Sequence, residues 1–166
     1  MSCLLRPLGR AQRARLEQLT RETGLFREEE VGTAVELLDE SLAGDDDYEF
    51  VGAFDGDHLI GYACWGPTPG TEGTWDLYWI VVERERQGAG IGTQLLAEVE
   101  FRLRAHGARL TVVETSSRAD YGPTRRFYEG RGYTRTATIA GYYAPGDDLV
   151  IYTKDLAPGD LARAAP

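Results

Sequence analysis

The chain has 166 residues, and its 27 acidic side chains outnumber its 18 Lys and Arg, which gives a formal net charge of −9. This length corresponds to about one domain and buries a sufficient core without disulfides or a structural metal. A negative field repels phosphate backbones and anionic membrane surfaces, so we expect neither a nucleic-acid-binding nor a membrane-binding protein. The charge instead favours a cationic partner such as an amine.

Cysteine and histidine counts exclude further classes. Cys3 and Cys64 are too few for a disulfide framework, and two histidines are too few for a three-histidine zinc site, so we predict no metal. No apolar run approaches the roughly 18 residues that span a bilayer, and the N-terminal segment lacks the apolar stretch of a signal peptide. The sequence therefore predicts a cytoplasmic protein, with residues 1–157 as a single domain and residues 158–166 as a disordered tail.

Hydrophobic periodicity predicts a strand and two helices first, at residues 4–8, 10–21 and 28–42. Three strands follow, with a hairpin turn at Asp55-Gly56, at residues 49–54, 59–65 and 75–82. The remaining elements are a helix, a strand, a helix and two strands, at residues 91–103, 110–113, 123–130, 133–140 and 149–152. This order is neither all-β nor a regular β-α alternation, and it fits one mixed sheet with helices on both faces.

The most informative segment is a glycine-rich turn, which follows the most apolar strand and opens a helix: Gln87-Gly88-Ala89-Gly90-Ile91-Gly92. Glycines let an anionic ligand approach the backbone, and the helix N-terminus adds unpaired N–H donors and partial positive charge. The segment lacks the Gly-Lys-Ser/Thr of a P-loop, and its glycine spacing differs from the dinucleotide-binding fingerprint. Coenzyme A is the third phosphate ligand to consider, and a tight turn without a ligand is the alternative.

Two motifs resemble the GCN5-related N-acetyltransferase (GNAT) family. Gln87-x-x-Gly90-x-Gly92 is similar to that family's Q/R-x-x-G-x-G/A signature, and the segment from Phe127 to Tyr133 is similar to its F-Y-x-x-x-G-F/Y pattern. The resemblance covers about residues 4–155. It implies a GNAT-like α/β fold, in which a mostly antiparallel seven-stranded sheet contains a splayed parallel pair and carries helices on both faces.

The resemblance also implies acetyl-CoA as the acetyl donor. The fourth strand would pair with the pantetheine arm and the turn would hold the pyrophosphate, which makes the cofactor-binding positions Ile80, Val81, Val82, Gln87, Gly88, Ala89, Gly90, Ile91, Gly92 and Thr93. Tyr121 stands where the family often has a pantetheine-contacting asparagine. We therefore expect either a different contact there or a tyrosine hydroxyl in place of the amide.

Three catalytic candidates follow from the resemblance. Tyr128 matches the tyrosine that protonates the coenzyme A thiolate in many family members, with packing beside Phe127 as its alternative role. A lysine-like amine needs roughly 4–5 kcal/mol to lose its proton at pH 7, so a carboxylate base is useful. Asp76 and Glu114 occupy positions where different family members carry that base. A water relay without a single base is the remaining alternative.

The acceptor is expected to be a cationic amine, either a small molecule or a peptide. Tyr142, Tyr143 and acidic runs at residues 28–30, 45–47 and 147–148 lie in regions that shape the acceptor site in this family. Each acidic run alone is more often a set of solvated loop charges. A coenzyme-A-binding module without turnover and a nucleotide-binding domain are the alternative classes, and the strand edges of the last hairpin permit a homodimer without requiring one.

Overall fold

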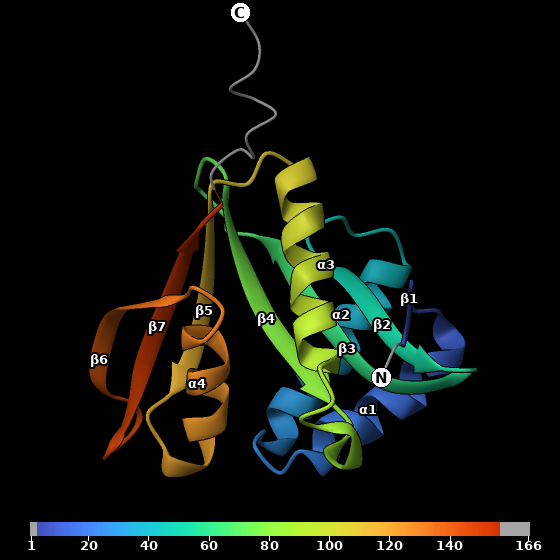
Figure 1. Ribbon diagram of the computed structural model, residues 1–166, viewed down its shortest axis with the longest axis horizontal. Helices are drawn as coiled ribbons and strands as arrows, with labels where there is room; N and C mark the ends of the chain where they lie inside the picture. Colours follow the sequence, from blue (N-terminus) through green and yellow to red (C-terminus); the bar gives the residue numbers. More distant parts are fainter. Residues whose placement is uncertain (1–2, 157–166) are drawn as a thin grey trace, which may run out of the picture. The chain divides into compact units, whose positions relative to one another are not determined.

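A computed structural model describes residues 3–156 of the chain. Seven strands form one mixed sheet in the order β1-β2-β3-β4-β5-β7-β6 (Figure 1). The strands are β1 (Leu4–Arg6), β2 (Glu49–Asp55), β3 (His58–Pro67), β4 (Thr74–Val82), β5 (Leu110–Ser116), β6 (Thr134–Ala144) and β7 (Asp147–Asp155). The pair β4/β5 is parallel, and β1/β2, β2/β3, β5/β7 and β6/β7 are antiparallel. The predicted fold class is confirmed.

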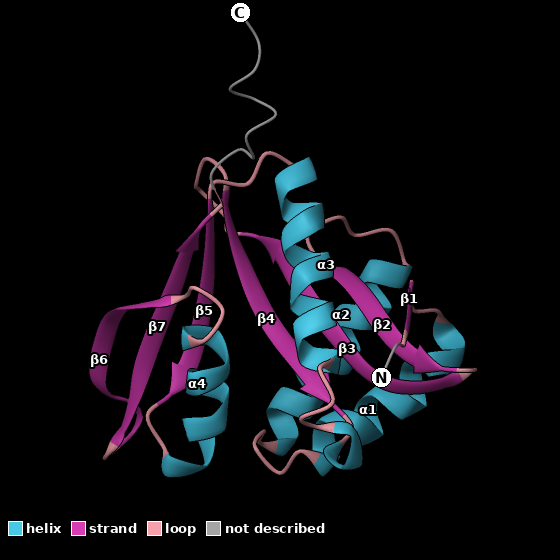
Figure 2. Cartoon of the chain, viewed as in Figure 1, coloured by secondary structure: helices cyan, strands magenta, loops and turns pink. Residues whose placement is uncertain are grey.

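The helices interrupt the strands in the predicted order (Figure 2). The α-helices are α1 (Arg13–Glu22), α2 (Glu28–Leu42), α3 (Ile91–Ala105) and α4 (Gly122–Glu129). Three short 3-10 helices join them, η1 (Arg10–Gln12), η2 (Arg84–Arg86) and η3 (Ala119–Tyr121). Within residues 3–156, no helix has both the length and the apolar character that crossing a membrane requires.

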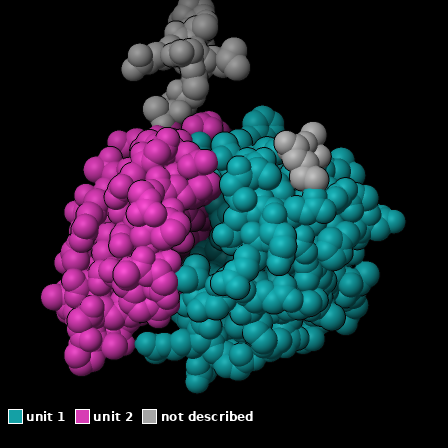
Figure 3. Space-filling view, turned by 60° about the horizontal axis from the view of Figure 1, so that its bottom comes forward, with its two compact units in different colours: residues 1–67, 78–102 teal, residues 68–77, 103–166 magenta. Residues whose placement is uncertain are grey.

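The chain divides into two compact units (Figure 3). Unit 1 comprises residues 1–67 and 78–102, and unit 2 comprises residues 68–77 and 103–166. The strand β4 contributes to both. The predicted tail at residues 158–166 lies outside the described residues, and the prediction of a single domain stays a prediction.

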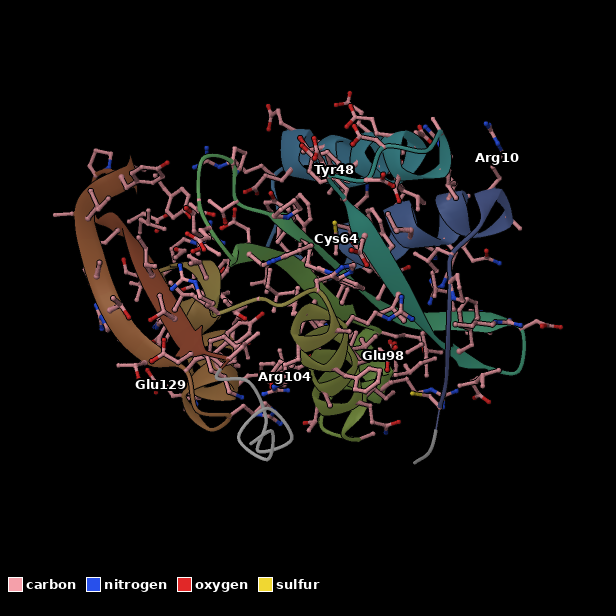
Figure 4. All side chains as sticks on the ribbon, turned by 90° about the horizontal axis from the view of Figure 1, so that it is seen from above. Arg10, Tyr48, Cys64, Glu98, Arg104 and Glu129 are labelled. Carbon is pink, nitrogen blue, oxygen red and sulfur yellow. The ribbon has the colours of Figure 1, made fainter. Side chains whose placement is uncertain are left out.

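Unit 1 is a layered body in which α1 and α2 cover one face of the sheet and α3 covers the other (Figure 4). The helical stripes form because apolar residues recur every three or four positions. They pack on strand residues in one buried cluster, which includes Leu16, Leu19, Ala34, Val35, Leu38, Phe50, Phe54, Tyr62 and Cys64. Cys64 is fully buried, as expected for a small core residue. Val81 of β4 belongs to the same cluster.

Unit 2 is built on the start of β4 and on β5, β7 and β6. Asp76 is opposite Val112 in the parallel pair, and Glu114 follows two residues later on β5. Because side chains alternate across a strand, Asp76, Val112 and Glu114 lie on one face of the sheet. The helix α4 is tied to β7 by a 2.6 Å hydrogen bond from the Tyr152 hydroxyl to Glu129.

The boundaries differ from the sequence prediction at three places. The first hairpin turns at Gly56-Asp57 rather than Asp55-Gly56, because Gly56 adopts a left-handed conformation with φ of 59° and β2 continues through Asp55. The last hairpin turns at Pro145-Gly146, and its strands extend to Ala144 and from Asp147, closer to the turn than predicted. The 3-10 helices were not predicted because three residues carry no periodicity.

We predict opposite effects on stability for two glycine substitutions in unit 1. A Cβ at Gly66 would lie 2.1 Å from the backbone oxygen of Asp47, so Gly66→Ala should lower the free energy of unfolding by about 1–3 kcal/mol. A Cβ at Gly32 in α2 meets nothing within 4 Å, so Gly32→Ala should raise it by about 0.5–1 kcal/mol. Urea denaturation measures both values, and equal stability of the two variants would contradict the prediction.

Candidate active site

The glycine-rich turn joins β4 to α3 within unit 1. Gly88 and Gly90 have φ of 80° and 85°, a left-handed backbone that L side chains rarely adopt. This backbone conformation is the reason that both positions are glycine. A Cβ at either position would meet no atom within 4 Å, so the space beside the turn is open. The first helical hydrogen bond runs from Gln94 N to Gly90 O at 3.1 Å. The N–H groups of this first turn therefore have no acceptor within the helix.

The remaining predicted donor-binding residues lie along the same segment. Ile80 and Val82 are half-buried, whereas the Val81 side chain is buried in the core cluster. The side-chain amide of Gln87 donates to Val82 O at 3.2 Å, so Gln87 connects the end of the strand to the turn. The structure thus places Ile80 to Thr93 in one strand-turn-helix unit, with the backbone of the turn exposed.

A charged cluster that the sequence did not indicate anchors this turn. The Glu83 N–H donates to Ile60 O at 2.8 Å, which fixes the end of β4 against β3. Arg15 of α1 donates to the Glu83 carboxylate, and Nε2 of His58 lies 3.2 Å from the same oxygen. Arg86 lies 3.6 Å from the other carboxylate oxygen. Arg15 and Glu83 are separated by 68 residues, so no local pattern predicts their contact.

The two candidate bases lie on one sheet face of unit 2. Burial raises the pKa of Glu114, and the charge of Asp76 raises it further. Burial also raises the pKa of Asp76, and a hydrogen bond from Thr68 Oγ1 to Asp76 Oδ2 at 2.8 Å partly offsets this shift. The structure therefore brings together the two carboxylates that the sequence proposed separately, and adds Thr68 to them.

Tyr128 and Tyr121 form the second group in unit 2. Tyr128 is only 4% exposed and packs edge-on against Phe127 and Tyr133, with ring centroids 5.1 and 5.3 Å away. Burial raises the pKa of Tyr128 well above its ordinary value, and the neighbouring Tyr121 adds to the shift. Among residues 3–156, no hydrogen-bond partner of the Tyr128 hydroxyl is found. The packing role and an acid role are therefore both compatible with this position.

The loop after β5, which leads to Tyr121, is held by buried polar contacts. Ser116 Oγ donates to the Asp147 carboxylate, which is 7% exposed, and accepts the Arg118 N–H at 3.0 Å. Arg125 of α4 donates to the backbone oxygens of Ser116 and Arg118 at 2.6 and 2.9 Å. The interpretation of residues 147–148 as solvated loop charges is therefore wrong for Asp147. Its carboxylate fixes the hairpin tip to the loop.

Comparisons with known proteins identify the family. A family model described as the acetyltransferase (GNAT) family matches residues 14–133. A solved structure from Desulfovibrio desulfuricans, assigned to the GNAT acetyltransferases, is 43% identical, with a TM-score of 0.88 over 94% of this chain and 100% of that chain. The chain therefore belongs to the GNAT acetyltransferase family, and the resemblance inferred from the sequence is confirmed.

Two more distant structures share the fold. One is an aminoglycoside 6′-N-acetyltransferase complexed with coenzyme A, at 22% identity and TM-score 0.76. The other is NAA60 from Arabidopsis thaliana in complex with a bisubstrate analogue, at 17% identity and TM-score 0.77. Each match covers 93% of this chain and 98% of the other. A comparison with curated proteins found no match.

We predict that Glu83→Gln loosens the glycine-rich turn. The substitution keeps the side-chain shape but removes the charge that Arg15 contacts, so the amides of residues 87–92 should exchange about 5–30-fold faster. Hydrogen exchange followed by mass spectrometry measures this, with amides of α2 as the internal reference.

Asp57→Asn is the matched control, because it removes only an exposed ion pair with Arg6. Equal protection of the turn in Glu83→Gln and in the control would contradict an anchoring role for Glu83.

Proposed function

We propose that the protein transfers the acetyl group of acetyl-CoA to a primary amine by direct attack in a ternary complex. The observation that carries the proposal is the open, left-handed turn at Gly88 and Gly90, at the N-terminus of α3, in a chain of the GNAT family. This turn fits a pyrophosphate, because it presents backbone N–H groups and no side chain obstructs the approach.

The donor would be held mainly by backbone groups. Ile80 and Val82 would offer strand N–H and C=O groups to the pantetheine arm, and residues 87–93 would surround the pyrophosphate. The hydrogen bond from the Glu83 N–H to Ile60 O supports this assignment, because the alternating residues Ile80 and Val82 then direct their N–H and C=O groups away from β3. Tyr121 would be the additional contact in unit 2.

The chemistry needs a base, an oxyanion donor and an acid. A neutral amine nitrogen attacks the thioester carbonyl, its proton passes to Glu114 or Asp76, and a strand N–H near Ile80 stabilises the oxyanion. The carbon–sulfur bond then breaks, and the thiolate takes a proton from the Tyr128 hydroxyl. Tyr128 is protonated at neutral pH, and the raised pKa that burial causes makes it a weaker acid than a free tyrosine. Its hydroxyl bonds to no side chain or backbone group among residues 3–156, which supports its role as the donor.

The acceptor would be a cationic small-molecule or peptide amine. The net charge of −9 attracts cations, and Tyr142, which is 56% exposed and edge-on to Tyr143, offers an aromatic face at the tip of the last hairpin. A cytoplasmic location, the absence of nucleic-acid, membrane and metal partners, and a homodimer stay predictions.

A thiol-release assay tests the proposal. Purified protein and acetyl-CoA are incubated with a panel of polyamines, amino acids, aminoglycosides and short peptides, while coenzyme A binding is followed by thermal shift. Release with one amine class would support transfer and identify the acceptor class. Stabilisation by coenzyme A without release would instead favour a binding module, and no stabilisation would contradict the assignment of the turn.

We predict that Tyr128→Phe lowers kcat by about 10²–10⁴-fold, because the thiolate loses its proton donor. The affinity for coenzyme A, measured by calorimetry, should stay within about twofold. Tyr133→Phe is the matched control, since it removes a hydroxyl from the neighbouring buried ring. A parallel loss of turnover and affinity in Tyr128→Phe would show that this residue packs and does not act as the acid.

A further inference from the structure

Thr68 has no role in the sequence analysis, yet it contacts a candidate catalytic group. It is the first residue after β3, and its Oγ1 donates to Asp76 Oδ2 at 2.8 Å. The two residues are eight positions apart, and the loop between them folds back so that they meet. Thr68 therefore fixes one oxygen of the Asp76 carboxylate.

The loop that carries Thr68 is itself rigid. The Thr68 N–H donates to Thr74 O at 2.9 Å, and Thr71 Oγ1 donates to Thr68 O at 2.7 Å. The loop is also tied to the residue before β5, because Arg109 N–H donates to Gly73 O at 2.7 Å. The side chain of Arg109 donates to Glu72 O as well. These bonds hold the hydroxyl of Thr68 at a set position relative to the parallel strand pair.

Asp155 of β7, opposite Leu110 at the start of β5, is a further carboxylate on the face of the sheet that carries the two candidate bases. Glu114 is opposite Ile151 on β7, and Val112 is opposite Thr153. Lys154 and Tyr152 are opposite Thr111 and Val113, the alternating positions whose side chains point to the other face. Among residues 3–156, no side chain donates a hydrogen bond to Glu114. The charge that raises the pKa of Glu114 is that of Asp76, the carboxylate that Thr68 contacts.

We propose that Thr68 is a positioning residue for the proton transfer. Its hydrogen bond holds Asp76 in the ionised form beside Glu114, and Glu114 is the group that accepts the proton. This proposal rests on the proposed function and assigns the two carboxylates different tasks. The proton moves from the acceptor ammonium nitrogen to a Glu114 oxygen, and Asp76 stays ionised throughout. The charge of Asp76 makes Glu114 a stronger base than an isolated carboxylate.

The pKa directions agree with this division. Burial raises the pKa of Asp76, and the hydrogen bond from Thr68 opposes this shift by stabilising the ionised carboxylate. The charge of Asp76 raises the pKa of Glu114, on top of the effect of burial. Activity that depends on ionised Glu114 should therefore fall as the pH drops through the raised pKa of Glu114.

The test compares Thr68→Val, which keeps the branched shape without the hydroxyl, with Thr68→Ser, which keeps the hydroxyl. In Thr68→Val the Asp76 carboxyl should titrate about 0.5–1 pH unit higher by ¹³C NMR. The acid limb of kcat/KM should move to lower pH, because a less ionised Asp76 raises the pKa of Glu114 less. The KM for acetyl-CoA should not change. Thr68→Ser should restore both values, because a role in packing alone would not distinguish the hydroxyl from the methyl group.

Two further variants assign the base. Glu114→Gln should lose rate at every pH, whereas Asp76→Asn should lose less rate than Glu114→Gln and move the acid limb to lower pH, because Glu114 then lacks the neighbouring charge. A larger loss in Asp76→Asn than in Glu114→Gln would overturn the assignment. If the wild-type protein is active and Thr68→Val has the same Asp76 titration and the same acid limb of kcat/KM as wild type, the proposed role of Thr68 is overturned.

Failure of the proposed function has a different signature. In that case the wild-type protein would release no thiol with any amine, although the Asp76 titration would still move in Thr68→Val. That result would reject proton transfer and retain only the contact between Thr68 and Asp76.

Discussion

The hydrogen bond from the Glu83 N–H to Ile60 O is the constraint on which the glycine-rich turn depends. It sets where β4 stops pairing with β3, and the next residues must leave the sheet to begin α3 at Ile91. The Glu83 carboxylate joins this point to α1 through Arg15. The core cluster beneath α1 and α2 thereby supports a turn whose own residues, chiefly glycines, offer few side chains for packing. The contacts of Glu83 before the turn therefore compensate for the few side-chain contacts within it.

The two carboxylates Asp76 and Glu114 lower the stability of the folded chain at neutral pH. A raised pKa means that the folded chain binds the proton more tightly than the unfolded chain, so ionisation of Asp76 and Glu114 at neutral pH opposes folding. A fold selected for stability alone would place a cation or an amide there. The hydrogen bond from Thr68 reduces this destabilisation for Asp76 while leaving Glu114 free to exchange a proton.

The element order can be predicted from the sequence because the buried residues of α1, α2, β2 and β3 are mainly the apolar residues, which recur with the spacing of a helix or a strand. The sequence predicts the turn because only glycine adopts the backbone of Gly88 and Gly90 without strain. It does not predict contacts that tertiary folding creates between distant polar residues, such as Arg15 with Glu83. The contact of Asp147 with Ser116 could not be predicted for the same reason, because nothing in an acidic run at a hairpin tip indicates which carboxylate is buried. Such residues look like surface residues until the chain is folded.

The irregular strand β6 bears on how the protein behaves at high concentration. β6 lies at the edge of the sheet and is exposed over most of its length, a position from which strands of different molecules join into aggregates. Register shifts between Arg135 and Ala137 and between Ile139 and Ala144 interrupt its pairing with β7. Such bulges bend and twist the free edge, so the uninterrupted ladder it offers to another chain is short. The distortion that shapes the hairpin tip therefore disfavours pairing of this edge with a strand of another molecule.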